Sequence, residues 1–197
     1  MTHEALPART LNEVRCYFLV TACPSCGKGP LNPQLPSGGS YQGPLAATAS
    51  CRACGAQQDY DFIVQQALPA QPPRSELINL SDEPSRIIDL AQWLGLFYML
   101  LSSADRQKQD HSVRRIGHQA SLCLAEALKF YGDDELPPES AFFSPGSPAA
   151  FRQHPEKFAR QRLRDMQAKL PSLAAMEQRL EQDGRKVRPR WWQFWRR

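Results

Sequence analysis

The chain has no long apolar segment. Its longest uncharged apolar run, Trp93 to Leu101, has nine residues, and a helix that spans a bilayer needs about 20. The sequence also does not open with a basic residue followed by an apolar segment and a small-residue cleavage site, the pattern of a secretory signal. These absences lead us to expect a soluble protein of the cytoplasm.

Common catalytic motifs are missing as well. There is no glycine-rich phosphate loop, no Gly-x-Ser-x-Gly turn and no His-Glu-x-x-His helix. Histidine is scarce, and His111 and His118, which lie seven residues apart, have no carboxylate or cysteine four positions further on. We interpret both as surface histidines. The sequence therefore favours a non-enzymatic protein, and it indicates no small-molecule substrate.

Cysteine, by contrast, occurs in a specific pattern. Four of the six cysteines form two Cys-x-x-Cys-Gly motifs, Cys23-Pro24-Ser25-Cys26-Gly27 and Cys51-Arg52-Ala53-Cys54-Gly55. Each glycine stands where a tight turn requires positive φ, so that both thiolates of a motif can face one ion. Four thiolates complete the tetrahedral shell of a structural zinc ion and leave no coordination position open. We therefore predict one structural zinc bound by Cys23, Cys26, Cys51 and Cys54.

A redox role is the alternative for these motifs, but two such pairs, each followed by glycine, fit one closed metal site better. The other two cysteines have apolar neighbours in the predicted elements. We interpret Cys16 and Cys123 as buried packing residues.

The residues around the two motifs predict a small sheet. Apolar residues alternate from Asn12 to Thr21, which predicts a strand that leads into the first motif. Proline and glycine are frequent from Lys28 to Pro44, which predicts a loop, and further strands are predicted over Leu45 to Ser50 and Gln58 to Val64. Residues 1–10 carry no periodic pattern and are predicted to form a loosely held arm.

This order of strand, motif, loop, strand, motif and strand resembles the zinc-ribbon family over residues 12–66. The resemblance implies a three-stranded fold around one zinc ion. It implies no single function, because zinc ribbons serve transcription, translation, nucleic-acid handling and protein docking. Ribbons that bind nucleic acids are usually basic, whereas three basic residues here are balanced by three acidic ones: Arg15, Lys28, Arg52, Glu13, Asp59 and Asp61. Asp59 and Asp61 are predicted to lie on a solvent-exposed sheet face.

The rest of the chain has helical periodicity. Residues 67–84 are rich in proline and are predicted to be a linker, followed by a helical domain over residues 85–184. Its first helix, capped by Ser81 or Ser85, and its second, from about Ser112 to Tyr131, have complementary apolar faces and predict a hairpin that folds independently of the metal. A third helix is predicted from about Pro155, kinked at Pro171, with a narrow apolar seam that packs within the chain: Ala159, Leu163, Met166, Leu170 and Leu173. The predicted fold class is α+β.

Charge is divided unevenly along the chain. Residues 1–151 hold 11 Lys and Arg against 15 Asp and Glu, whereas residues 152–197 hold 13 against 5. The last segment, residues 185–197, has six basic residues and no acidic ones. Because buried tryptophan rings contribute strongly to binding, we predict a partner-binding tail: Arg190, Trp191, Trp192, Phe194, Trp195, Arg196 and Arg197.

Taken together, these patterns favour a monomeric, non-enzymatic adaptor that docks to a protein partner through its helical domain and its tail. Two alternatives stay open. The basic third helix and tail could bind a nucleic acid, with tryptophans stacked on bases, or the tail could attach to a membrane surface.

Overall fold

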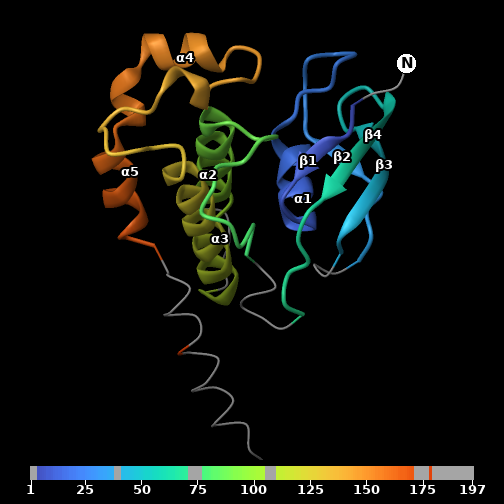
Figure 1. Ribbon diagram of the computed structural model, residues 1–197, viewed down its shortest axis with the longest axis horizontal. Coiled ribbons are helices and arrows are strands. Elements are labelled where there is room, and N and C mark those ends of the chain that lie inside the picture. The colour runs from blue at the N-terminus through green and yellow to red at the C-terminus, as the bar shows by residue number, and fades with distance from the viewer. Residues whose placement is uncertain (1–3, 38–40, 71–76, 105–109, 171–177, 179–197) are drawn as a thin grey trace, which may run out of the picture.

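A computed structural model describes residues 4–37, 41–70, 77–104, 110–170 and 178. Within these ranges the fold is α+β, with a four-stranded sheet and five α-helices. Figure 1 shows the sheet and α1 on one side, the pair α2 and α3 in the middle, and α4 and α5 on the other side. No helix in the described part of the chain is long and apolar enough to cross a membrane.

The sheet has the strand order β1-β4-β3-β2. Its two long strands, β3 (Gly43–Cys51) and β4 (Gln57–Val64), are an antiparallel pair that confirms two predicted strands. The other two strands lie where none was predicted. β2 (Leu31–Pro33) pairs with β3 inside the predicted loop, and β1 (Leu6–Ala8) pairs in parallel with β4 inside the predicted arm. The three-stranded ribbon is therefore replaced by a four-stranded sheet.

The strand predicted from Asn12 is wrong, because these residues form the helix α1 (Leu11–Val20). Thr10 begins the helix, and its Oγ1 accepts a hydrogen bond from the Glu13 N–H at 3.2 Å. Val14 and Phe18, four residues apart, are both fully buried. Phe18 packs edge-to-face on Tyr60 of β4, with ring centroids 5.0 Å apart. The helix thus covers the face of the sheet that an edge strand would have left open.

The predicted helical hairpin is confirmed as α2 (Leu90–Ala104) and α3 (Asp110–Leu128), which pack side by side. The start of α2 differs from the prediction. Ser85 Oγ accepts hydrogen bonds from the Ile87 and Ile88 N–H groups in the preceding turn, but the helix itself begins after Asp89. Asp89 accepts from the Gln92 N–H at 2.9 Å, and Gln92 Oε1 accepts from the Asp89 N–H at 3.0 Å. This reciprocal pair is a capping box.

The predicted third helix is divided into several short pieces. The 3-10 helix η3 (Pro155–Phe158) is followed by α5 (Arg160–Gln167), and η2 (Glu139–Ala141) and α4 (Ser147–Gln153) precede it. Leu163 is fully buried, and Met166 and Leu170 pack against the same core. The seam therefore packs within the chain over these three residues, as predicted. Pro171 and Leu173 lie outside the described residues.

One continuous core joins the sheet, α1, α2, α3 and α5. Ile78, in the predicted linker, is buried in this core. Its carbonyl accepts a hydrogen bond from Thr10 Oγ1, and the Leu77 carbonyl accepts one from Asn12 Nδ2 at 2.8 Å. The segment between the sheet and α2 is thus packed against α1. The division into a ribbon, a linker and a helical domain stays a prediction, and the structure adds that both halves contribute to the same core.

Candidate metal centre

The two cysteine motifs meet at one end of the sheet. The Sγ atoms of Cys23, Cys26, Cys51 and Cys54 all lie within 4.8 Å of one another. The Cys23–Cys54 and Cys26–Cys51 pairs are 3.8 and 3.7 Å apart. A tetrahedral ion with metal–sulfur bonds of about 2.3 Å requires sulfur–sulfur edges of about 3.8 Å. These two distances match such edges and all four sulfurs lie within 4.8 Å of one another, so they could hold a metal ion.

The two motifs fold in the same way. In each, the glycine N–H donates to the carbonyl of the first cysteine, at 2.7 Å for Gly27 to Cys23 and 2.9 Å for Gly55 to Cys51. Both glycines have positive φ, +68° and +74°, a conformation in which a Cβ would be strained. The predicted turn chemistry is confirmed at both positions. The turn places both thiols of a motif on the same side of the backbone.

Backbone amides around the sulfurs favour thiolates. Burial raises the pKa of Cys23, but the N–H groups of Ser25 and Cys26 and the neighbouring thiols lower it further, to about 6. The N–H groups of Cys54 and Ala53 lower the pKa of Cys51. The Ala56 N–H lowers the pKa of Cys54, yet burial and the three other cysteines raise it more, to about 12. A full set of four thiolates thus needs a cation at its centre, which these residues are placed to hold.

The cluster lies where several elements of the fold meet. Cys51 is the last residue of β3, so the second motif closes the hairpin between β3 and β4, and the first motif follows α1. Cys23 and Cys51 belong to the core, 1% and 3% exposed. Four protein sulfurs would complete the coordination shell and leave no position for water or a substrate. An ion at this site would connect α1, β3 and β4.

The chain matches no protein-family model, no curated protein and no solved structure.

The other predicted site residues lie elsewhere. The tail residues Arg190, Trp191, Trp192, Phe194, Trp195, Arg196 and Arg197 lie outside the described part of the chain. Asp59 and Asp61 are exposed on the outer sheet face, as predicted, and Cys123 is buried on α3.

The prediction of a surface histidine is wrong for His118, which is fully buried on α3 and has no hydrogen-bond partner for either ring nitrogen among the described residues. Gly117 and Ala120 beside it are small and buried, whereas Arg114, four positions before it, is exposed.

A buried polar cluster between the two halves was also not predicted. Glu126 on α3 is 4% exposed. Its Oε1 accepts from Lys129 Nζ at 2.7 Å and its Oε2 from Asn79 Nδ2 at 2.5 Å. Lys129 also donates to the Ser81 carbonyl at 2.7 Å, so the cluster ties the predicted linker to α3. The i, i+3 spacing of Glu126 and Lys129 is a common surface pattern, and only the tertiary contact with Asn79 distinguishes it.

We expect this cluster to make stability depend on pH. Burial is the main cause that raises the pKa of Glu126 to about 7, and nearby Glu13 adds to it, while Lys129 and Asn79 oppose it. Because the folded pKa lies above the unfolded one, the unfolded chain loses this proton first. Protonated Glu126 therefore stabilises the folded protein below about pH 4.5, and this stabilisation is lost as the pH rises to about 7. The free energy of unfolding should change by on the order of 3 kcal/mol across this window.

The measurement is urea unfolding from pH 4.5 to 8, followed by circular dichroism. Glu126→Gln should remove most of the decline across this window, whereas Glu139→Gln, at an exposed position on η2, should keep it. Parallel profiles for the wild type and Glu126→Gln would contradict the prediction.

Proposed function

We propose that this chain is a zinc-stabilised, non-enzymatic adaptor that docks to a protein partner through its helical half and its C-terminal tail. The observation that supports this best is the closed set of four sulfurs. A site with no open coordination position stabilises a fold and performs no metal-assisted chemistry. The protein then serves by presenting its surfaces, as a monomer in the cytoplasm.

Zinc is the proposed ion because four thiolates in tetrahedral geometry select zinc or iron–sulfur chemistry. Sulfur–sulfur distances of 3.7 and 3.8 Å fit the edges of a single-ion tetrahedron. Elemental analysis of purified protein should give one zinc per chain. Stoichiometric iron with visible absorption would instead contradict the choice of metal.

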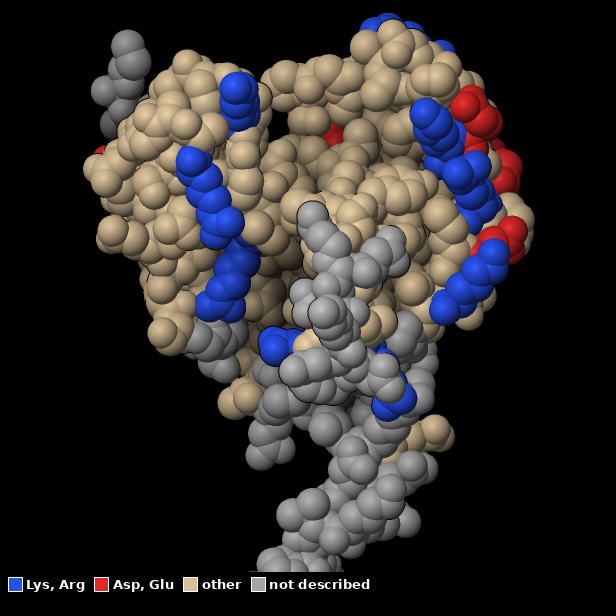
Figure 2. All heavy atoms as spheres, turned by 180° about the vertical axis from the view of Figure 1, so that it is seen from behind, with Lys and Arg blue, Asp and Glu red and all other residues tan. Residues whose placement is uncertain are grey.

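The distribution of charge supports a protein partner over a nucleic acid. The outer face of the sheet carries the exposed acidic residues Asp59 and Asp61. In the half that contains α4 and α5, Lys and Arg side chains lie directly beside Asp and Glu (Figure 2). A phosphate backbone binds best to a continuous basic surface, whereas mixed charges are ordinary at protein interfaces. The nucleic-acid alternative then depends on the tail and on a run of Lys and Arg side chains on the half that contains the sheet and α1, where no Asp or Glu side chain lies beside them in this view (Figure 2).

We expect the tail to be the main docking element. A chain that ends at Pro189 should lose a partner that the full chain captures. Trp192→Ala with Trp195→Ala should abolish capture even at low salt, because apolar anchors are insensitive to salt. Arg196→Gln with Arg197→Gln should mainly slow association, because charge steers the encounter and is screened. Surface plasmon resonance across a salt series separates the two effects.

Two results would favour the alternatives. A steep log–log dependence on salt, governed by the arginines, would indicate a nucleic acid. Binding to anionic vesicles with a blue shift of tryptophan emission would indicate a membrane surface. If the chain that ends at Pro189 keeps every interaction of the full chain, the tail has no docking role.

A further inference from the structure

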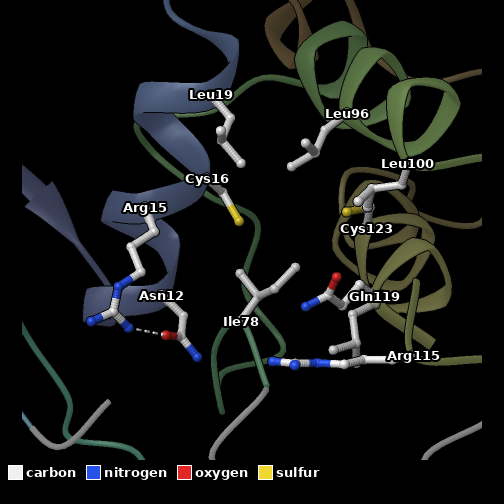
Figure 3. A pocket seen from close by; sticks show the side chains of 11 residues that line it. Asn12, Arg15, Cys16, Leu19, Ile78, Leu96, Leu100, Arg115, Gln119 and Cys123 are labelled. Carbon is white, nitrogen blue, oxygen red and sulfur yellow. Dashed lines mark hydrogen bonds between the residues drawn. The ribbon is translucent and has the colours of Figure 1, made fainter. Parts of the chain in front are cut away.

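A cavity of about 360 Å³ lies where α1 meets α2 and α3 (Figure 3). Small-molecule sites usually have volumes of about 300–1,000 Å³, so this cavity is large enough for one small ligand. It is distinct from the metal centre, since none of the four clustered cysteines lines it. Each helix contributes residues from a single face. Asn12, Cys16 and Leu19 on α1, for example, are spaced by four and three residues.

Polar and apolar residues occupy opposite ends of this cavity. Along α1, Asn12 and Arg15 come first and Leu19 last, and along α3, Arg115 and Gln119 precede Leu122 and Cys123. Figure 3 shows Arg115 and Gln119 at one end, with Ile78 beside them, and Leu19 and Leu96 at the other. The charged side chains of the wall thus lie at one end, and the other end is apolar. A ligand that matched it would itself have one polar and one apolar end.

The apolar end is formed by Leu19, Leu96 and Leu100, whose side chains point into the space (Figure 3). The two thiols that line the middle add no charge. Burial raises the pKa of Cys16 to about 12 and the pKa of Cys123 well above its usual value. A hydrocarbon chain would be buried favourably at this end, by about 25 cal/mol per Å² of apolar surface.

The polar end carries two arginines. Arg15 lines it from α1 and Arg115 from α3, and the described residues that line the cavity include no acidic one. Arg15 is held in place by donating to Asn12 Oδ1 at 2.7 Å and to the Pro36 carbonyl at 2.8 Å. A guanidinium has five donors in a planar fork that matches a carboxylate. This end therefore favours a carboxylate.

We propose that the cavity binds a small monocarboxylate with a hydrocarbon chain, such as a medium-chain fatty acid. Its carboxylate would lie at Arg115 and its chain would extend toward Leu19 and Leu96. The basic C-terminal tail is a poor occupant, because its arginines would meet Arg15 and Arg115. A nucleotide is equally unsuitable, because the apolar end has no polar side chain to bind a base.

Calorimetry with the full chain and decanoate, below its micellar concentration, tests the proposal. Wild-type protein should bind one decanoate, and decanol at least tenfold more weakly. Arg115→Gln should weaken decanoate binding by on the order of tenfold to a hundredfold, the effect of one hydrogen bond to a charged group, and should leave decanol binding unchanged. Arg114→Gln is the matched control, since Arg114 is exposed on the same turn and does not line the cavity.

A second pair of variants tests the apolar end. Leu19→Trp fills it and should reduce the binding of both decanoate and decanol, whereas Leu136→Trp should reduce neither. The two leucines are similarly exposed, 42% and 45%, so Leu136→Trp is a matched control for the added ring. The proposal is overturned if decanoate does not bind, if Arg115→Gln behaves as Arg114→Gln, or if Leu19→Trp behaves as Leu136→Trp.

Discussion

Removal of the metal by a chelator is expected to unfold the end of the sheet that carries the cysteine motifs. Structural zinc contributes on the order of 10 kcal/mol to small domains, which is comparable with the whole free energy of unfolding of a typical protein, about 5–15 kcal/mol. Without the ion, thiolates held within 4.8 Å of one another repel or must take up protons. The turns at Gly27 and Gly55 would then lose their main stabilising contact.

The helical half of the chain, from α2 onward, should respond to chelation differently from the sheet. The apolar faces of α2 and α3 cover each other, so most of the helical circular dichroism should persist after chelation. Its thermal midpoint should fall, because α1 packs on α2 within the shared core. Amide NMR spectra before and after chelation distinguish the two halves.

The matched variants are cysteine substitutions inside and outside the cluster. Cys23→Ser with Cys51→Ser should abolish zinc binding and disorder the sheet. Cys16→Ala removes a cysteine that packs against the core outside the cluster, and it should keep the zinc and cost only a few kcal/mol. An ordered, zinc-free sheet in the double variant would contradict the proposed role of the metal.

The metal-site geometry could be predicted from sequence because it is local. Two residues between cysteines and a glycine after each pair fix the turn, and both turns have the expected positive φ. The hairpin of β3 and β4 was predictable for the same reason, since the two strands are close together in the sequence. Sequence patterns that span only a few residues predict the local structure of those residues directly.

The helix α1 was missed because its apolar pattern satisfies two periods. Val14, Cys16, Phe18 and Val20 alternate as in a strand, but Leu11, Val14 and Phe18 also share one helical face, and these three are its fully buried apolar residues. The discriminating signal was Thr10 followed by Glu13, the Thr-x-x-Glu pattern of a helix start. This helix-start pattern favours a helix over a strand for the residues that follow Thr10.

Long-range contacts account for the other differences. β1 pairs with β4 through Leu6 and Phe62, which are far apart in sequence. A strand of three residues is too short for its own pattern to indicate such a partner. The same holds for Asn79, whose role emerges only when α3 brings Glu126 against it. Burial of such polar groups depends on tertiary packing, which composition does not reveal.

Replacement of Asp89 by alanine is expected to destabilise the helical half by about 3–5 kcal/mol. Asp89 is fully buried. Its Oδ1 caps α2, and its Oδ2 accepts from the Phe143 and Ser144 N–H groups at 3.1 and 2.8 Å and from Ser147 Oγ at 2.5 Å. Loss of a helix cap costs about 1 kcal/mol, and each buried donor left without a partner costs about 1–3 kcal/mol.

Asparagine at the same position separates the two roles of Asp89. Asparagine caps a helix as well as aspartate does, so Asp89→Asn should restore stability if capping of α2 is the whole effect. If the bonds to residues 143–147 matter, its amide N–H₂ will face the Phe143 and Ser144 N–H groups, and stability will stay close to that of Asp89→Ala. We expect the second result in thermal unfolding, with both midpoints about 10 °C below the wild type. Asp134→Ala, which removes an exposed carboxylate, should change the midpoint little. Full recovery of the midpoint in Asp89→Asn would show that Asp89 does not hold the start of α4 against α2.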